Sequence, residues 1–282
     1  MAPAPSPLRR WRRPIFALGL ALGLAAAASP AAAGPQRVVS LNLCADQFAV
    51  LLLEPERIAA LSFLSRDPSL SYVAEAAEGF EVTSDEAEDV LRRRPDLVLA
   101  GPFAKPQTLR LLRARGIAVH AVGMPQDFDA IAAEIAGVAA ALGEEARGAG
   151  LIAEMRRTLD AARPRDDRRP VALTYQAGGF TAGGGTLSDA VLRAAGWRNF
   201  AAESGLSGYG YLGLETVLSG RPDLLIADAG PEGAPSLAEA LLAHPALRGL
   251  ERMRLPGPLV ACGGPFTAQA VALLAAARGE RP

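Results

Sequence analysis

The 282-residue chain contains only two cysteines, Cys44 and Cys262, and two histidines, His120 and His244. These side chains are the usual soft metal ligands and nucleophiles of proteins. A site for a bare zinc or manganese ion needs several His, Cys or carboxylate ligands that converge on the ion. Two histidines are too few for such a site, so we expect no bare metal ion as the ligand of this protein.

The same residues suggest one catalytic alternative. Cys44 could act as a nucleophile with His120 as its base and a carboxylate to orient the imidazole. No motif around Cys44 marks it as activated, however, and this alternative leaves the internal repeat described below unexplained. We therefore expect no enzyme activity and no cofactor.

Short apolar runs bounded by turn residues alternate with longer segments of helical periodicity. This alternation is typical of α/β domains with parallel or mostly parallel sheets. The predicted strands are 37–41, 57–61, 96–100, 118–121 and, further along, 171–175. The predicted helices between the first four strands are 46–53, 84–93 and 107–115.

An internal repeat is the strongest organisational signal. Residues 88–100 and 215–227 align without gaps and share eight of thirteen residues, including Arg-Pro-Asp-Leu. Each copy predicts a helix, a proline stop and a strand. Two similar lobes would explain why the unit occurs once in each half of the chain.

Residues 127–163 separate the two copies. Apolar residues recur in this segment at helical spacing, and it contains no proline. We expect one long bridging helix here, with two collinear helices as the alternative because of Gly143, Gly148 and Gly150. The predicted domains are therefore a first α/β lobe at 34–126, the bridge at 127–163 and a second α/β lobe at 164–282. A ligand cleft between the lobes is the default site.

Ligands of open α/β sheets bind beyond the carboxyl ends of the strands. The residues that follow the predicted strands are therefore the candidates for ligand contact, and several are aromatic, so they offer ring faces for packing. Loop 208–211 adds two tyrosines between glycines. The candidates are Asn42, Cys44, Asp46, Phe63, Arg66, Phe103, Tyr175, Gln176, Tyr209, Tyr211, Cys262 and Phe266.

Cys44 and Cys262 each follow a predicted strand, one in each lobe. Three interpretations are open: a disulfide between the lobes, a soft ligand pair for a metal complex, or two independent thiols. We favour thiols that are independent or close to the ligand, because a disulfide across the mouth of a cleft would restrict its opening.

The order of these motifs resembles that of the ABC-importer binding proteins for ferric siderophores, haem or cobalamin. The resemblance runs from the Val-Val-Ser strand at 38–40 through both repeats to the Cys-Gly-Gly-Pro-Phe-Thr segment at 262–267. It implies two α/β lobes joined by a rigid helix. It also implies a periplasmic protein, acting as a monomer, that delivers its small-molecule ligand to an ABC permease.

The resemblance further implies that one surface glutamate on each lobe docks against arginines of the permease. The matching residues are Glu88, seven positions before Pro95, and Glu215, seven positions before Pro222. Paired carboxylates on two lobes would orient the protein on a membrane partner by electrostatic contact at two points.

Three cargo classes follow from the resemblance, and the residues favour one slightly. Haem needs an axial Tyr or His, for which Tyr209 and Tyr211 are candidates. Anionic siderophores are matched by arginine, and only Arg66 lies in a predicted cleft loop. The shortage of arginine favours a neutral or weakly charged ligand such as cobalamin.

The glycine-rich turn 183–186 resembles a phosphate-binding loop only superficially, because it lacks the Gly-Lys-Ser/Thr ending. Thr186 and Asp189 instead fit a capping box at a helix start. We expect this turn to be structural.

The first 33 residues predict a secretory signal peptide. Arginines at 9, 10, 12 and 13 precede an apolar run of about 14 residues, shorter than the roughly 20 that a spanning helix needs. Small residues at 31–33 predict cleavage near Ala33, by the Sec or the twin-arginine route. Cleavage would change the formal charge from −1 to about −5, which gives no basic footprint for nucleic acid.

Overall fold

In the computed structural model, residues 34–227, 242 and 244–279 are described. The first lobe contains a fully parallel five-stranded sheet in the order β3-β2-β1-β4-β5. Every residue of the two strands β1 and β4 is buried, as expected for strands covered on both faces. The strands are β1 (Val38–Ser40), β2 (Ile58–Ser62), β3 (Val82–Thr83), β4 (Leu97–Ala100) and β5 (Ala118–Ala121).

Helices and short 3-10 turns connect these strands. All four expected strands of this lobe and its three expected helices are present, with ends displaced by zero to three residues. The helices are α1 (Leu43–Leu52), α2 (Ala74–Ala77), α3 (Ala87–Arg92) and α4 (Pro106–Ala114), and the 3-10 turns are η1 (Pro55–Arg57) and η2 (Phe63–Arg66).

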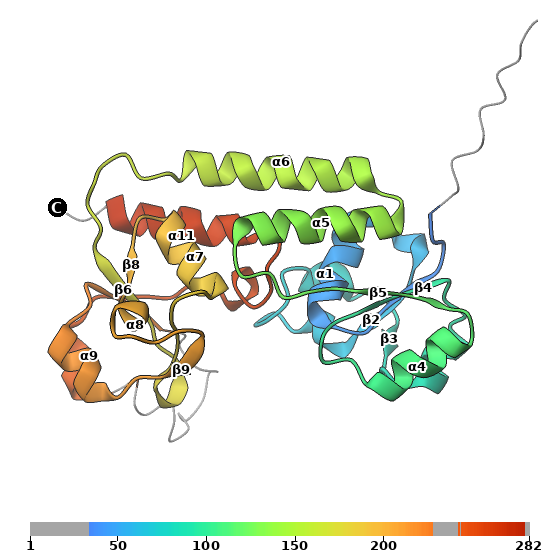
Figure 1. Cartoon of the computed structure of the whole chain (residues 1–282), viewed down its shortest axis with the longest axis horizontal. Helices are drawn as coiled ribbons and strands as arrows, with labels where there is room; N and C mark the ends of the chain where they lie inside the picture. Colours follow the sequence, from blue (N-terminus) through green and yellow to red (C-terminus); the bar gives the residue numbers. More distant parts are fainter. Residues whose placement is uncertain (1–33, 228–241, 243, 280–282) are drawn as a thin grey trace, which may run out of the picture. The chain divides into compact units, whose positions relative to one another are not determined.

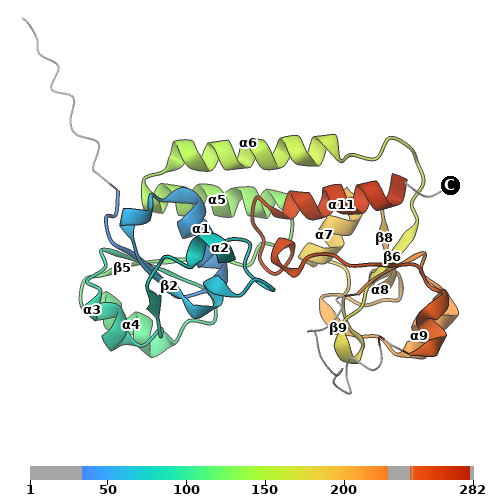
Figure 2. The ribbon, with the colours of Figure 1, turned by 180° about the vertical axis from the view of Figure 1, so that it is seen from behind.

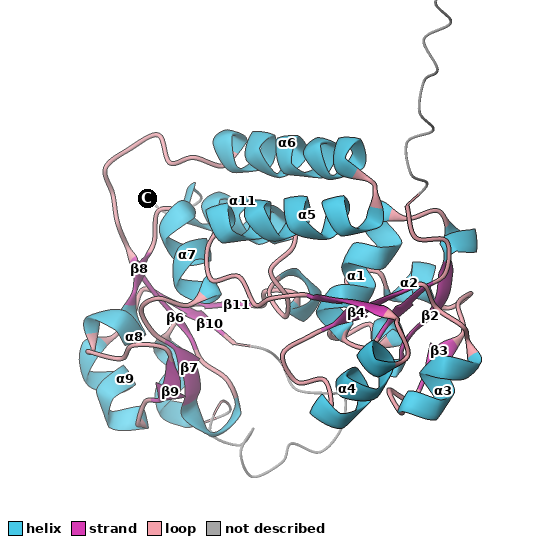
Figure 3. Cartoon of the chain, turned by 45° about the vertical axis from the view of Figure 1, so that its right-hand side comes forward, coloured by secondary structure: helices cyan, strands magenta, loops and turns pink. Residues whose placement is uncertain are grey.

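The second lobe contains a parallel four-stranded sheet, β11-β10-β6-β8, and a separate antiparallel pair, β7-β9. Figure 3 shows the two lobes with their strands in magenta. The strands are β6 (Val171–Thr174), β7 (Phe180–Ala182), β8 (Arg198–Asn199), β9 (Tyr209–Tyr211), β10 (Leu224–Ile226) and β11 (Arg252–Met253). The helices are α7 (Leu187–Ala194), α8 (Phe200–Glu203), α9 (Leu214–Gly220) and α11 (Thr267–Gly279), with 3-10 turns η3 (Ala177–Gly179), η4 (Pro245–Gly249) and η5 (Gly257–Leu259).

Two expectations for this lobe are wrong. Residues 209–211 form strand β9, paired with β7, where the sequence suggested an aromatic loop. Cys262 does not follow a strand, because the preceding apolar residues lie in η5 and the turn after it. Pro256 and Pro258 flank the start of η5, and proline lacks the N–H that a sheet ladder requires.

The segment between the lobes is also not one bridging helix, nor two collinear ones. It forms α5 (Phe128–Leu142) and α6 (Glu145–Ala161), which turn back at Gly143 and pack side by side. Gly143 adopts a left-handed conformation with φ 71°, which glycine tolerates without a steric penalty. Figures 1 and 2 show α6 running beside α5 and α11 above both sheets.

The repeat predicted from sequence is a structural repeat. Arg94 and Arg221 both have positive φ, 48° and 45°, immediately before the proline of each copy. The aspartate that follows the proline accepts hydrogen bonds from the neighbouring strand: Asp96 from Arg37 N, and Asp223 from Val171 N. Each copy therefore starts its strand, β4 or β10, in the same register against the first strand of its lobe.

One apolar core runs through both lobes and the helices above them, within the compact unit Ala33–Pro282. It includes Val38 and Leu99 of the first lobe, Ile135 of α5 and Trp197 and Leu224 of the second lobe. Trp197 is 1% exposed, and its indole N–H donates to Leu274 O at 2.9 Å. Smaller clusters complete each lobe. The lobes are therefore joined by shared packing as well as by the chain.

Candidate functional site

Asn42, which follows the carboxyl end of β1, is the N-cap residue of helix α1. Its Oδ1 accepts hydrogen bonds from Cys44 N at 2.9 Å and from Ala45 N at 3.4 Å. A Cβ on Gly101 would come within 2.5 Å of Asn42 Cγ, so glycine there leaves room for the cap. Asn42 thereby positions Cys44 at the first turn of α1.

Asp46 is fully buried beneath the end of β2. Its carboxylate accepts hydrogen bonds from Ser62 N at 3.0 Å and Ser62 Oγ at 2.5 Å. Burial raises the pKa of Asp46 to about 6, and hydrogen bonds from Ser40 and Ser62 partly oppose that rise. The predicted ligand contact is wrong for Asp46, because its carboxylate ties α1 to β2 inside the lobe.

Arg66 lies in η2 with an exposed side chain, but its guanidinium is held by the backbone. It donates to Ala77 O at 3.4 Å and to Phe80 O. The one arginine that the sequence placed in a cleft loop is therefore already paired with carbonyl oxygens.

Four aromatic side chains stand exposed at the carboxyl ends of strands or on β9. Phe63 and Phe103 of the first lobe are 69% and 80% exposed, and Tyr209 and Tyr211 of the second lobe are 52% and 72% exposed. Exposed aromatic rings offer apolar area and stacking faces to a ligand. We call these four residues the aromatic platform.

In the second lobe, Phe180 of β7 supports the platform. Its ring lies parallel to that of Tyr209, with centroids 6.0 Å apart, and meets the ring of Tyr211 edge-on at 5.5 Å. The antiparallel pairing of Phe180 with Tyr211 sets this arrangement. Burial raises the pKa of Tyr209, which keeps its hydroxyl protonated.

Tyr175 and Phe266 are buried, so the prediction that they contact a ligand is wrong. Tyr175 closes β6 within the core of the second lobe, and its hydroxyl donates to Leu212 O at 3.0 Å. Phe266 stacks on Tyr72 of the first lobe with centroids 4.5 Å apart. The Tyr72 hydroxyl also accepts from Gln269 Nε2 at 2.9 Å. Sequence reasoning missed Tyr72, because no local pattern distinguishes this loop tyrosine.

Cys44 and Cys262 form a disulfide, which overturns the favoured interpretation of independent thiols. The sulfurs are 2.06 Å apart, and the bond joins the start of α1 to the segment before α11 across 218 positions of sequence. Together with the Tyr72 contacts, this bond links the lobes both covalently and by packing. A bonded sulfur is also no nucleophile, which removes the basis of the Cys44 enzyme alternative.

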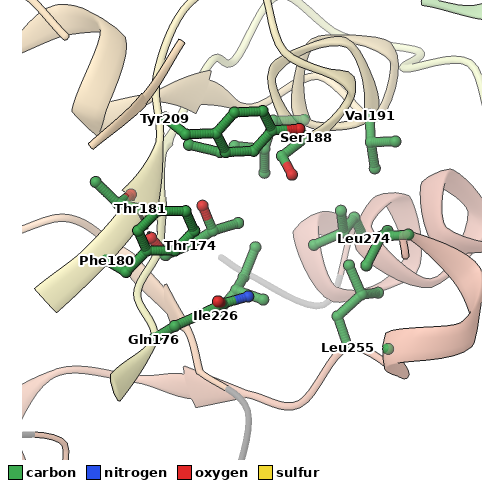
Figure 4. A pocket seen from close by; sticks show the side chains of 14 residues that line it. Thr174, Gln176, Phe180, Thr181, Ser188, Val191, Tyr209, Ile226, Leu255 and Leu274 are labelled. Carbon is green, nitrogen blue, oxygen red and sulfur yellow. Dashed lines mark hydrogen bonds between the residues drawn. The ribbon is translucent and has the colours of Figure 1, made fainter. Parts of the chain in front are cut away.

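A pocket opens in the second lobe beside the aromatic platform. Figure 4 shows Gln176, Tyr209 and Ser188 around a space whose far wall is apolar. Its volume is about 100 Å³. Gln176, predicted from sequence, is the polar residue at its exposed side.

The described residues contain no cluster of three or more His, Cys, Asp or Glu that would hold a metal ion. His120 lies on the edge strand β5, and His244 caps η4 by accepting from Ala246 N at 3.2 Å. Thr186 likewise caps α7 by accepting from Asp189 N, which confirms that the glycine-rich turn is structural.

Comparison with known proteins agrees with this architecture. Residues 38–252 match the family of periplasmic binding proteins. The chain belongs to the periplasmic binding protein family.

Among curated relatives of this binding protein is a cobalamin-binding protein of Halobacterium salinarum. The two are 29% identical over 214 residues, which cover 74% of this chain and 58% of the relative. The chain thus spans less than two thirds of that relative's length.

Solved structures of haem-binding and vitamin B12-binding proteins have the same fold. The periplasmic heme-binding protein RhuT from Roseiflexus sp. RS-1 is 28% identical, with a TM-score of 0.72 over 86% of this chain and 98% of its own. BhuT, solved with two hemes, is 26% identical, with a TM-score of 0.69 over 85% and 96%. The vitamin B12 binding protein BtuF of Vibrio cholerae, at 20% identity and TM-score 0.66 over 86% and 96%, shows the fold alone.

In this binding protein, Glu88 and Glu215 occupy equivalent positions in the first turns of α3 and α9. Both side chains are exposed. Among the helices in the described part of the chain, none is long and apolar enough to span a bilayer.

Proposed function

We propose that this protein binds a corrinoid of the cobalamin type between its lobes and delivers it to the permease of an ABC importer. The aromatic platform carries this proposal. Phe63 and Phe103 on one lobe and Tyr209 and Tyr211 on the other offer exposed rings to a large, flat ligand. Aromatic faces contribute both apolar area and stacking energy to such contacts.

Charge supports a corrinoid over an anionic iron chelate. Recognition of anionic groups relies on arginine, whose guanidinium forms paired hydrogen bonds. Arg66, the arginine expected in the cleft, already donates to the carbonyls of Ala77 and Phe80. The cobalamin-binding relative from H. salinarum supports the same class of cargo.

Haem is the second candidate, and Tyr211 favours it. The Tyr211 side chain is 72% exposed, and its hydroxyl has no hydrogen bond to another described residue. A phenolate can serve as an axial ligand of haem iron. Tyr209 is less suitable, because burial raises its pKa and so disfavours the phenolate. The haem-binding structures RhuT and BhuT support this candidate.

Titration of the purified protein with cyanocobalamin, haemin and a ferric siderophore separates these cargoes. We expect cyanocobalamin to bind most tightly, and Phe103→Ala to weaken it about three- to tenfold, the value of one aromatic contact. Leu273→Ala, an exposed apolar residue on α11, serves as the control with unchanged affinity. Tight binding of haemin with a Soret band that shifts in Tyr211→Phe would favour haem instead.

We further propose that Glu88 and Glu215 dock against cationic residues of the permease. Their equivalent positions on two lobes and their exposure support this role, since charge pairs at an interface mainly set orientation and association rate. In proteoliposomes with the cognate importer, Glu88→Ala with Glu215→Ala should lower uptake at least tenfold without changing ligand affinity.

The control for this experiment is Glu145→Ala with Glu154→Ala, which removes two exposed carboxylates from α6 instead. Uptake should be close to wild type in that variant. Equal uptake in all three proteins would refute docking through Glu88 and Glu215.

Export to the periplasm completes the proposal. It is supported by membership of a periplasmic family and by the arginines, apolar run and small residues at the start of the chain. Residues 1–33 lie outside the described residues. The intact mass of the periplasmic protein should correspond to a chain that starts at Gly34.

A further inference from the structure

The pocket in the second lobe is built from elements that are distant in sequence. Thr174 and Gln176 come from β6 and the turn after it, Ser188 and Val191 from α7, and Leu274 from α11. In Figure 4 these side chains surround one space. Its volume of about 100 Å³ holds several water molecules or one small organic group.

Three polar groups in this pocket have no hydrogen-bond partner among the described residues. Thr174 Oγ1 is buried and unpaired. Neither the Ser188 hydroxyl nor the Gln176 amide is joined by a hydrogen bond to another described residue. Buried polar atoms in native proteins are nearly always paired, so the orphaned hydroxyl of Thr174 calls for a partner.

The remaining wall is apolar and carries no charge. The aliphatic side chains are Val191, Leu192, Ile226, Leu255, Val260 and Leu274, and none of the lining residues is ionisable at neutral pH. An ionised group placed here would lose its hydration without gaining a counter-ion, which is strongly unfavourable. The pocket therefore suits an uncharged group that is mostly apolar and offers one or two hydrogen-bonding atoms.

The pocket borders the surface on which the cargo is proposed to rest. Tyr209 lines it and also belongs to the aromatic platform, and Phe180 lines it while supporting Tyr209 and Tyr211. Gln176 is exposed at the same border. A side group of a ligand stacked on Tyr209 would reach the pocket directly.

We propose that this pocket receives an uncharged side group of the cargo, an amide arm or an aromatic base, and hydrogen-bonds it through Thr174. This assignment rests on the proposed function and names the part of the cargo that the second lobe selects. The pocket discriminates against cargoes whose side groups at this position are carboxylates.

Two variants test the pocket without depending on one another. Thr174→Val keeps the shape of the side chain and removes the hydroxyl, and it should weaken binding about two- to tenfold, the range of one net hydrogen bond. Val191→Phe fills the pocket and should weaken binding more than tenfold. Thr216→Val, on the exposed face of α9, is the control with unchanged affinity. Thermal unfolding verifies that each variant is folded.

The probes are cyanocobalamin, dicyanocobinamide, which keeps the amide arms but lacks the benzimidazole nucleotide, and haemin, which has carboxylate arms. Loss of affinity for cyanocobalamin alone identifies the base as the bound group. Loss of affinity for both cyanocobalamin and dicyanocobinamide identifies an amide arm as the bound group.

Wild-type affinity reports on the proposed function, whereas the ratio of variant to wild-type Kd reports on the pocket. If wild type binds haemin and neither corrinoid, the proposed function is wrong. A ratio near one in Thr174→Val and in folded Val191→Phe, for whichever probe wild type binds, overturns the pocket assignment.

Discussion

Buried Asp46 illustrates how a residue with the right chemistry for a binding site instead serves the fold. Its carboxylate reaches both the N–H and the hydroxyl of Ser62 and is fully buried. Burial disfavours the charged form, which is why its pKa rises to about 6 despite these hydrogen bonds. The residue links α1, and therefore Cys44, to the end of β2.

This raised pKa makes a stability prediction. A group whose folded pKa exceeds its unfolded value stabilises fully below the unfolded pKa, near 4, and this contribution is lost as pH rises to about 6. Asp46→Asn removes the titration. Its free energy of unfolding relative to wild type should therefore rise by about 2 kcal/mol between pH 4 and pH 7, measured by urea unfolding.

Asp67→Asn is the opposite control, because hydrogen bonds from Ser69 lower the pKa of the exposed Asp67. Its contribution to stability is present at neutral pH and is lost as pH falls. A difference between wild type and Asp46→Asn that does not vary with pH would contradict the buried-carboxylate interpretation.

At the scale of elements, the turn between α5 and α6 determines how the lobes are joined. Helical periodicity continues across residues 127–163, but Gly143 ends α5 in a left-handed conformation, and its N–H donates to Ala140 O. This C-cap turns the chain so that α6 runs back beside α5 and packs on α11. The bridge is consequently a helical hairpin.

Two Gly→Ala substitutions should have opposite effects on stability. Gly143→Ala places a Cβ in a left-handed residue, which costs about 1 to 2 kcal/mol. Gly150→Ala lies inside α6 with no atom near the added Cβ, and it should stabilise by about 0.5 to 1 kcal/mol. Denaturant unfolding of wild type and both variants measures these changes in the free energy of unfolding. Destabilisation by Gly150→Ala would argue against a continuous α6.

At the scale of the whole molecule, the Cys44–Cys262 disulfide and the Tyr72 contacts connect two lobes that also share a core. The proposed ligand would meet a largely preformed surface between such lobes, so little binding energy would be spent on ordering the protein. The disulfide and the Tyr72 contacts also limit how far the lobes can separate unless the disulfide is reduced.

Breaking the disulfide should therefore lower stability. The bond closes a loop of 218 positions, for which chain entropy predicts about 5 kcal/mol, and measured losses for native disulfides are about 2 to 5 kcal/mol. Cys44→Ser and the double variant with Cys262→Ser should lose similar amounts in guanidinium unfolding. Dithiothreitol should lower the wild-type midpoint and leave the double variant unchanged; an unchanged wild type would show that the bond is absent.

Local sequence patterns were sufficient to predict most helices and strands of the first lobe and the similarity of the two lobes. The strand at 118–121 has the predicted ends, and the repeat predicted the matching helix-to-strand connections that Arg94 and Arg221 begin. These features depend on apolar spacing and proline stops within a few residues, so they are written into short stretches of sequence.

Only the tertiary structure decided which candidates reach the surface. Phe103 and Tyr175 look alike as aromatics at strand ends, yet one is 80% exposed and the other is buried, because burial depends on what packs against each sheet. The disulfide and the Tyr72 contacts likewise join residues far apart in the chain. No local pattern specifies such pairings. The sequence thus determined the class of protein, whereas packing determined which aromatic side chains are exposed.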